Sequence, residues 1–160
     1  MTYHPTTTAL LLVDPYNDFL SEGGKLWRRV AAIAEDVNLL DHLRALVKAA
    51  RDKGFKIFFV PHHRWEPGDY VKWRHPTPYQ LGGAKRQSFA KGTWGGTFHD
   101  DFQPQPDDIV VHEHWGSRWA NGLRHRRFVR PCLRCAPPKG WCWLKMIMTP
   151  GVLDHSSPTR

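Results

Sequence analysis

Thr8-Ala9-Leu10-Leu11-Leu12-Val13-Asp14-Pro15 is the stretch from which the fold can be inferred. Its five consecutive apolar residues predict a short strand buried on both faces, as in parallel sheets. Pro15 lacks an amide hydrogen, so we expect the strand to end at Asp14. Ligands of open α/β sheets bind beyond the carboxyl ends of the strands. Asp14 is therefore a candidate functional residue, and a loop-capping aspartate is the alternative.

The residues that follow predict a helix and two further strands. Apolar residues at three- and four-residue spacing predict an amphipathic helix from about residue 27 to 53, with a break near Asp36 and a cap at Asn38. Apolar runs at 55–60 and 109–112 predict the second and third strands. A strand, a helix and a second strand form a βαβ unit, so the predicted fold class is α/β with an open parallel sheet.

Polar side chains stand at the predicted end of each strand. The first strand ends at Asp14, His62 and His63 follow the second, and His112 ends the third. Because the carboxyl ends of parallel strands share one edge of the sheet, we expect these side chains to lie close together. The irregular segment 61–106 should cover the same edge, since so long a loop in a compact domain is usually functional. A surface excursion that packs its own tryptophans is the alternative.

Composition narrows the class of protein. A chain of 160 residues can form one domain with a real core. Its longest apolar runs, of five or six residues, are too short to cross a membrane, and the first residues lack the apolar core of a signal peptide. Three cysteines are an odd number and imply no disulfide framework. These features predict a cytoplasmic protein without a membrane partner.

The positive charge is confined to the last part of the chain. Residues 1–117 contain 14 basic and 14 acidic residues, whereas 118–160 contain nine basic residues and one acidic residue. We therefore expect a domain at 1–117 and a separate basic tail at 118–160. A nucleic-acid-binding arm is one interpretation of the tail, but the neutral body argues against a nucleic-acid partner.

Two motifs resemble those of the isochorismatase-like cysteine hydrolases, a family that includes nicotinamidases, carbamoylases and isochorismatases. Residues 9–19, ALLLVDPYNDF, resemble the opening strand of the family and its aspartate motif. Residues 91–96 and 102–111 resemble the segment that leads into its third strand. The resemblance covers residues 8–117. It implies a Rossmann-like sheet of about six parallel strands in a three-layer α/β/α arrangement, here truncated after about the third strand.

The resemblance also implies an activity, namely hydrolysis of a C–N bond in a small amide or carbamoyl compound, or of a vinyl ether. Family members use an aspartate, a lysine and a nucleophilic cysteine, and we expect this chain to need no cofactor. Asp14 matches the aspartate, and His112 stands where the family places its lysine. Phe19, His62 and Trp94 are our candidates for substrate binding. We expect no metal site, a small-molecule substrate as the partner, and assembly into a homo-oligomer.

The tail departs from the family pattern. Cys132, Cys135 and Cys142 do not follow an apolar strand at a helix start, so none can be assigned as the nucleophile. We interpret residues 118–160 as an out-of-frame reading of a GC-rich gene, which makes an inactive truncated relative the alternative to an active hydrolase. A zinc site at His125 and the three cysteines is a further alternative. Residues 141–148 are a candidate strand for pairing with the exposed edge of the third strand.

Overall fold

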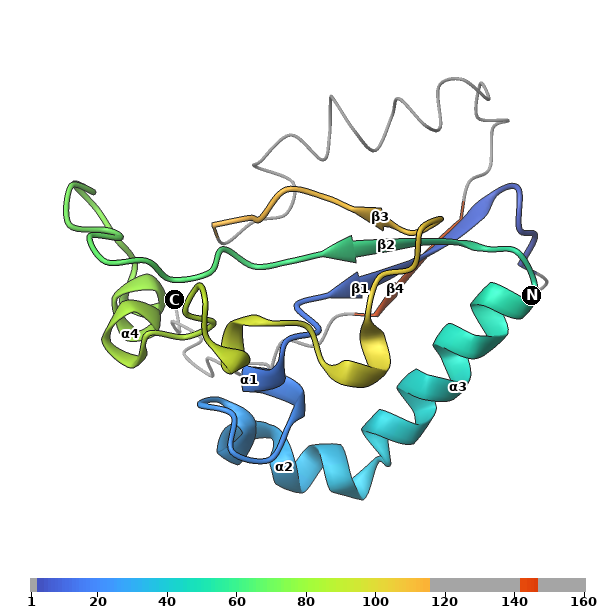
Figure 1. Ribbon diagram of the computed structural model, residues 1–160, viewed down its shortest axis with the longest axis horizontal. Coiled ribbons are helices and arrows are strands. Elements are labelled where there is room, and N and C mark those ends of the chain that lie inside the picture. The colour runs from blue at the N-terminus through green and yellow to red at the C-terminus, as the bar shows by residue number, and fades with distance from the viewer. Residues whose placement is uncertain (1–2, 116–141, 147–160) are drawn as a thin grey trace, which may run out of the picture.

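The sheet contains four parallel strands in the order β3-β2-β1-β4 (Figure 1). The computed structural model describes residues 3–115 and 142–146. The strands are β1 Thr8–Val13, β2 Lys56–Val60, β3 Ile109–Val110 and β4 Cys142–Met146. The register pairs Leu10 with Ile57 on one side and with Leu144 on the other. The predicted open parallel α/β sheet is confirmed.

The predicted helical region consists of two helices, as the break near Asp36 indicated. These are α2 Trp27–Asp36 and α3 Leu39–Asp52, preceded by the short α1 Asn17–Leu20 and followed by α4 Pro78–Arg86. Two 3-10 turns, η1 Trp94–Gly96 and η2 Asp100–Phe102, complete the described helical elements. Asn38 occupies the N-cap position of α3, but its φ of 47° is left-handed and its side chain makes no capping hydrogen bond.

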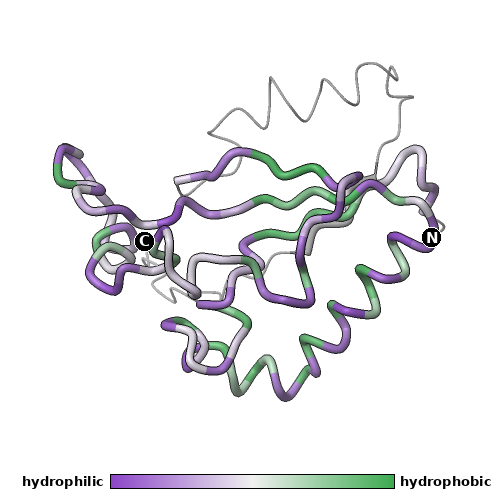
Figure 2. Tube along the Cα trace, viewed as in Figure 1, coloured by the Kyte–Doolittle hydropathy of each residue, from purple (hydrophilic) through white to green (hydrophobic). Residues whose placement is uncertain are grey.

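Strand β1 is buried on both faces, as is β2 from Ile57 onward, which explains their continuous apolar sequence. Leu10, Leu12 and Phe59 form one core with Leu43 and Val47 of α3. The alternate residues of β1 pack with Phe58 and Val60 in a second core on the other face. Helices α1, α2 and α3 all lie on the same side of the sheet (Figure 1), and the apolar stretches of β1 and β2 run side by side (Figure 2).

The pairing expected for residues 141–148 is wrong. Their strand, β4, pairs with β1 rather than with the edge at β3. The lengths of the strands explain the difference, because β3 has two residues whereas β1 offers a ladder six residues long. The remainder of the predicted tail lies outside the described residues. Within the described part of the chain, no helix is long and apolar enough to cross a membrane.

Candidate functional site

The site lies at the carboxyl ends of β1, β2 and β3, where Asp14, His62 and His114 come together. The backbone pairing of the strands continues past their ends and fixes these residues. The N–H of Asp14 donates to the carbonyl of Val60 at 3.2 Å, and the N–H of His114 donates to that of Pro61 at 3.0 Å. His62 and His114 also form a parallel bridge. Residues far apart in the sequence are thus held together by main-chain hydrogen bonds.

Asp14 and His114 form a buried pair. Nε2 of His114 lies 3.1 Å from Oδ1 of Asp14, and the two residues are only 3% and 2% exposed. An ionised carboxylate can only accept, so Nε2 carries the hydrogen of this contact. Burial of a carboxylate is costly unless it is paired, and this imidazole supplies the partner. Asp14 also has a left-handed φ of 57°, a conformation that aspartate tolerates better than most residues.

His62 is buried next to this pair, with its ring 5.2 Å from that of His114 in an edge-on arrangement. Burial lowers the pKa of His62 below its usual value of 6.5, which favours the neutral ring. Nδ1 lies 2.7 Å from the carbonyl oxygen of His63 and therefore carries the single hydrogen. Nε2 is left as an acceptor, and it has no partner among the described residues. Nδ1 of His114 is also buried without a partner there.

Tyr16 fixes the backbone of His62. Its hydroxyl donates to the carbonyl of His62 at 2.8 Å. Burial raises the pKa of Tyr16, so the phenol stays protonated and remains a donor at neutral pH. The ring of Tyr16 stacks on Phe89 and Phe98, with centroids 5.0 and 5.3 Å apart. Tyr16 therefore links the loop after β1 to the loop after β2.

A cavity of about 130 Å³ lies beside His62. Apolar and aromatic side chains form much of its wall, and several polar or charged side chains, such as His62 and Arg86, line the rest. The lining residues include Phe19, His62, Trp65, Tyr79, Arg86 and Phe89. Pockets for drug-sized ligands measure roughly 300–1,000 Å³, so this cavity suits a small molecule.

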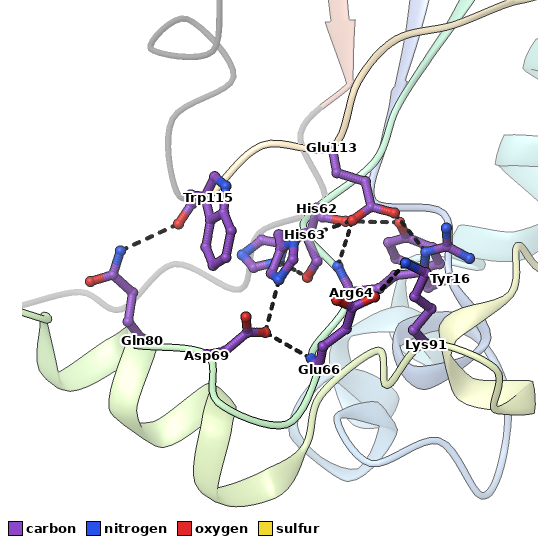
Figure 3. A network of polar contacts seen from close by, with 10 residues as sticks. All are labelled: Tyr16, His62, His63, Arg64, Glu66, Asp69, Gln80, Lys91, Glu113 and Trp115. Carbon is purple, nitrogen blue, oxygen red and sulfur yellow. Dashed lines mark hydrogen bonds and ion pairs between the residues drawn. The ribbon is translucent and has the colours of Figure 1, made fainter. Parts of the chain in front are cut away.

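A polar network holds the loop after β2 against the end of β3 (Figure 3). The Glu113 carboxylate accepts from Nε of Arg64 at 2.6 Å and from the N–H of Arg64 at 3.0 Å. Burial alone would raise the pKa of Glu113, but the hydrogen bonds and charge of Arg64 outweigh it and lower that pKa. His63 bonds Asp69 at 2.8 Å and stacks on Trp115. These contacts fix the segment on which His62 sits.

Asn17 and Asp18, which belong to the motif at 9–19, have structural roles. Oδ2 of Asp18 accepts from the N–H of Phe89 at 2.6 Å, and Oδ1 accepts from the N–H of Lys25 at 3.1 Å. Nδ2 of Asn17 donates to the carbonyl of Trp94 at 3.1 Å. These two side chains anchor the segments that enclose the cavity.

The site residues that the sequence predicted fall into two groups in the structure. Phe19 and His62 line the cavity, and the ring of His62 contacts that of His114, the partner of Asp14. Trp94 is 53% exposed and does not belong to the described cavity wall. His112 is exposed and lines a separate open groove with Tyr16 and Arg64, so the described partner of Asp14 is His114. Side chains two residues apart on a strand share one face, so the spacing of His112 and His114 was the available signal for His114.

The described cysteine lies far from Asp14. Cys142 begins β4 and pairs with Thr8, at the opposite end of β1. A strand rises about 3.3 Å per residue, so roughly 20 Å separates its backbone from that of Asp14. Cys132 and Cys135 lie outside the described residues. In the part of the chain that the structure describes, no group of three or more His, Cys, Asp or Glu side chains could hold a metal ion.

Comparison with known proteins adds sequence relatives. The model of the isochorismatase domain family matches residues 8–124. Ureidoacrylate amidohydrolase RutB of Rhizobium rhizogenes is 30% identical over 123 residues, which cover 69% of this chain and 49% of that protein. RutB of Pantoea ananatis is 28% identical over 120 residues, with 68% and 48% coverage. The chain thus spans about half the length of these curated relatives.

Two solved structures share the fold. A cysteine hydrolase from Pseudomonas syringae pv. phaseolicola superposes with a TM-score of 0.55 and 21% identity, over 86% of this chain and 58% of that one. An isochorismatase from Pseudomonas putida gives a TM-score of 0.50 and 21% identity, over 81% and 54%. At this level of identity the similarity concerns the fold alone.

Proposed function

The chain belongs to the isochorismatase family, and on this premise we propose that it hydrolyses a C–N bond of a small amide or carbamoyl compound. The observation that carries the proposal is the buried Asp14–His114 pair beside a small aromatic cavity. The curated relatives are named as amidohydrolases, which supports an amide rather than another substrate class. Location in the cytoplasm and assembly into a homo-oligomer belong to the same proposal: the first rests on the composition of the sequence and the second on the resemblance.

In this proposal Asp14 acts as the general base. Its Oδ1 is held by His114, while Oδ2 has no hydrogen-bond partner among the described residues. Oδ2 takes a proton from a water molecule as the water oxygen bonds to the substrate carbonyl carbon. The C–N bond then breaks, and the leaving nitrogen receives that proton. His114 is a positioning residue that orients the carboxylate through its contact with Oδ1.

Water is the proposed nucleophile because no cysteine of the sequence stands where the family places its nucleophile. The backbone of Cys142, the one cysteine in the described part of the chain, lies roughly 20 Å along the strand from that of Asp14. The same position favours a competing candidate, an inactive relative that retains only ligand binding. Hydrolysis of a vinyl ether remains a further candidate because it needs a proton-transfer group and no cysteine.

Turnover by the purified chain tests the proposal. The panel is ureidoacrylate, N-carbamoyl amino acids, nicotinamide and isochorismate. Asp14→Asn preserves the shape of the side chain, and asparagine tolerates the left-handed φ of 57° at this position. Asp107→Asn is the matched control, because it makes the same change at an exposed carboxylate. We expect turnover of an amide or carbamoyl compound by the wild type and the control, with a loss of about 100-fold or more in Asp14→Asn. Equal rates in wild type and Asp14→Asn would refute the role of Asp14, and no turnover of any compound would favour the inactive relative.

A further inference from the structure

Ser88 carries a buried hydroxyl that has no partner. The residue is 7% exposed and lines the cavity, and Oγ makes no hydrogen bond within the described part of the chain. Its neighbours Gln87 and Phe89 have left-handed φ values of 53° and 55°. Such strain persists only where the surroundings enforce it, and here Asp18 holds the N–H of Phe89. The backbone therefore keeps an unsatisfied hydroxyl at the cavity, where a bound acceptor would satisfy it.

Arg86 brings an unpaired cation to the same wall. It is the last residue of α4 and lines the cavity, and its buried Nε has no hydrogen-bond partner within residues 3–115. Among the described residues it forms no ion pair either. A Cβ on Gly82 would lie 3.2 Å from Nη1 of Arg86, so the glycine leaves room for the guanidinium. Arg29 also lines the cavity, and the described lining contains no Asp or Glu that could pair with Arg86.

The cavity lining also contains a hydrogen-bond acceptor. Nε2 of His62 is a buried acceptor, because Nδ1 carries the hydrogen that faces the carbonyl of His63. The cavity thus combines donors at Arg86 and Ser88 with an acceptor at His62, between the rings of Tyr79 and Phe89. A ligand that satisfies all of them has an anionic oxygen group and an N–H, joined by a short linker.

We propose that Arg86 and Ser88 form a carboxylate-binding subsite, so that the substrate is a small amido or ureido acid whose N–H is accepted by His62. This inference rests on the proposed function, because it concerns the same cavity. Guanidinium and hydroxyl donors bind carboxylates through charge-assisted hydrogen bonds, which are stronger than neutral ones. A neutral amide of the same shape leaves the guanidinium without its anion and binds more weakly.

Binding of a matched acid and amide tests the subsite separately from catalysis. The probes are ureidoacetate and ureidoacetamide, which differ only in the group that would face Arg86, and Kd is measured by calorimetry with the full chain. The variants are Arg86→Gln and Ser88→Ala. Arg28→Gln is the matched control, because it removes an exposed arginine from α2 that is not part of the described cavity wall. Thermal unfolding of each variant checks that it is folded. If one is not, Arg86→Met replaces Arg86→Gln, and Ser88→Cys replaces Ser88→Ala.

We expect the wild type and Arg28→Gln to bind the acid at least about tenfold more tightly than the amide. Arg86→Gln and Ser88→Ala should reduce that preference by about threefold or more, with little change in the Kd of the amide. Equal affinity of the wild type for both probes, binding of neither, or an unchanged preference in both variants would overturn the subsite. A preference for the acid without turnover of any compound would support the subsite and count against the proposed function alone.

Discussion

Nε2 of His114 lies 3.1 Å from Oδ1 of Asp14, although the two residues are 100 positions apart in the sequence. The contact joins the end of β1 to the segment that follows β3, across the intervening β2. Asp14 is therefore held both by the neighbouring strand, through the backbone hydrogen bond to Val60 of β2, and by a side chain from two strands away. The position of Asp14, the proposed base, thus depends on the correct pairing of all three strands β1, β2 and β3.

Replacement of His114 should affect both stability and catalysis. His114→Ala leaves the Asp14 carboxylate buried without its partner, and we expect the free energy of unfolding to fall by about 1.5–3 kcal/mol. His114→Gln can still donate an N–H and should recover part of the loss. Urea unfolding and kcat for the best substrate are the measurements.

His112→Ala is the comparison that decides between the two histidines. His112 is exposed, so its removal should change the free energy of unfolding by less than about 0.5 kcal/mol. If His112→Ala abolishes turnover while His114→Ala does not, the assignment suggested by the family resemblance is correct and ours is wrong. His75 is also exposed, so His75→Ala is the control for the loss of an imidazole elsewhere on the surface.

Stability should fall as the pH is lowered through the range in which histidines titrate. Burial lowers the pKa of His62, whereas an exposed imidazole in the unfolded chain titrates near 6.5. Below about pH 6.5 the unfolded state therefore binds a proton that the folded state does not, so protonation favours unfolding. His62 can contribute up to about 1.4 kcal/mol per pH unit, and His99, whose pKa burial also lowers, acts in the same direction.

Urea unfolding at pH 7.5, 6.5 and 5.5 measures this dependence. His62→Gln should flatten it, and His75→Gln, at an exposed position, should leave it unchanged. The lowered pKa of Glu113 does not interfere, because its contribution is lost only below the ordinary value of 4.5. Identical slopes for wild type and His62→Gln would show that His62 is not the titrating group.

Replacement by alanine should change the free energy of unfolding in opposite directions at two glycines, Gly95 and Gly83. A Cβ on Gly95 would overlap the Asp18 carboxylate, which is fixed by the N–H groups of Phe89 and Lys25. We expect Gly95→Ala to lower the free energy of unfolding by about 1–3 kcal/mol. Gly83 lies within α4 with open space at its Cβ, so Gly83→Ala should raise it by about 0.5–1 kcal/mol. Calorimetric unfolding gives both values, and similar changes in the two variants would contradict this account of Gly95.

Translation of the encoding DNA in the other two frames tests the interpretation of the tail. We expect one frame downstream of codon 117 to encode a fourth apolar strand followed by a cysteine at a helix start. If neither frame reads as protein, residues 118–160 are genuine sequence. Zinc and nucleic-acid binding then become the assays to perform on the tail.

Much of the fold follows from local sequence. The apolar run that ends at Asp14 and Pro15 predicts β1, because a buried parallel strand needs no polar face. The three- and four-residue spacing predicts α2 and α3, and their break lies beside Asp36 as expected. The partner of β4 could not be predicted, since any exposed edge can pair with a short apolar strand.

The site was harder to predict than the strands. Alternation places His112 and His114 on the same face of an ideal strand, but β3 ends at Val110 and the backbone beyond it is no longer regular. Hydrogen bonds to Pro61 and His63 then decide which imidazole is buried. The exposure of Trp94 likewise depends on the η1 turn, which Asn17 fixes from a distant part of the chain.

The parallel arrangement of β1, β2 and β3 has a kinetic consequence. Asp14, His62 and His114 are separated by about fifty residues each, so the site requires two long chain closures before any of its contacts can form. High contact order makes such closures slow. In a refolding experiment helical circular dichroism should therefore return first, and ligand binding should reappear only in the slowest phase, when the last ladder is complete.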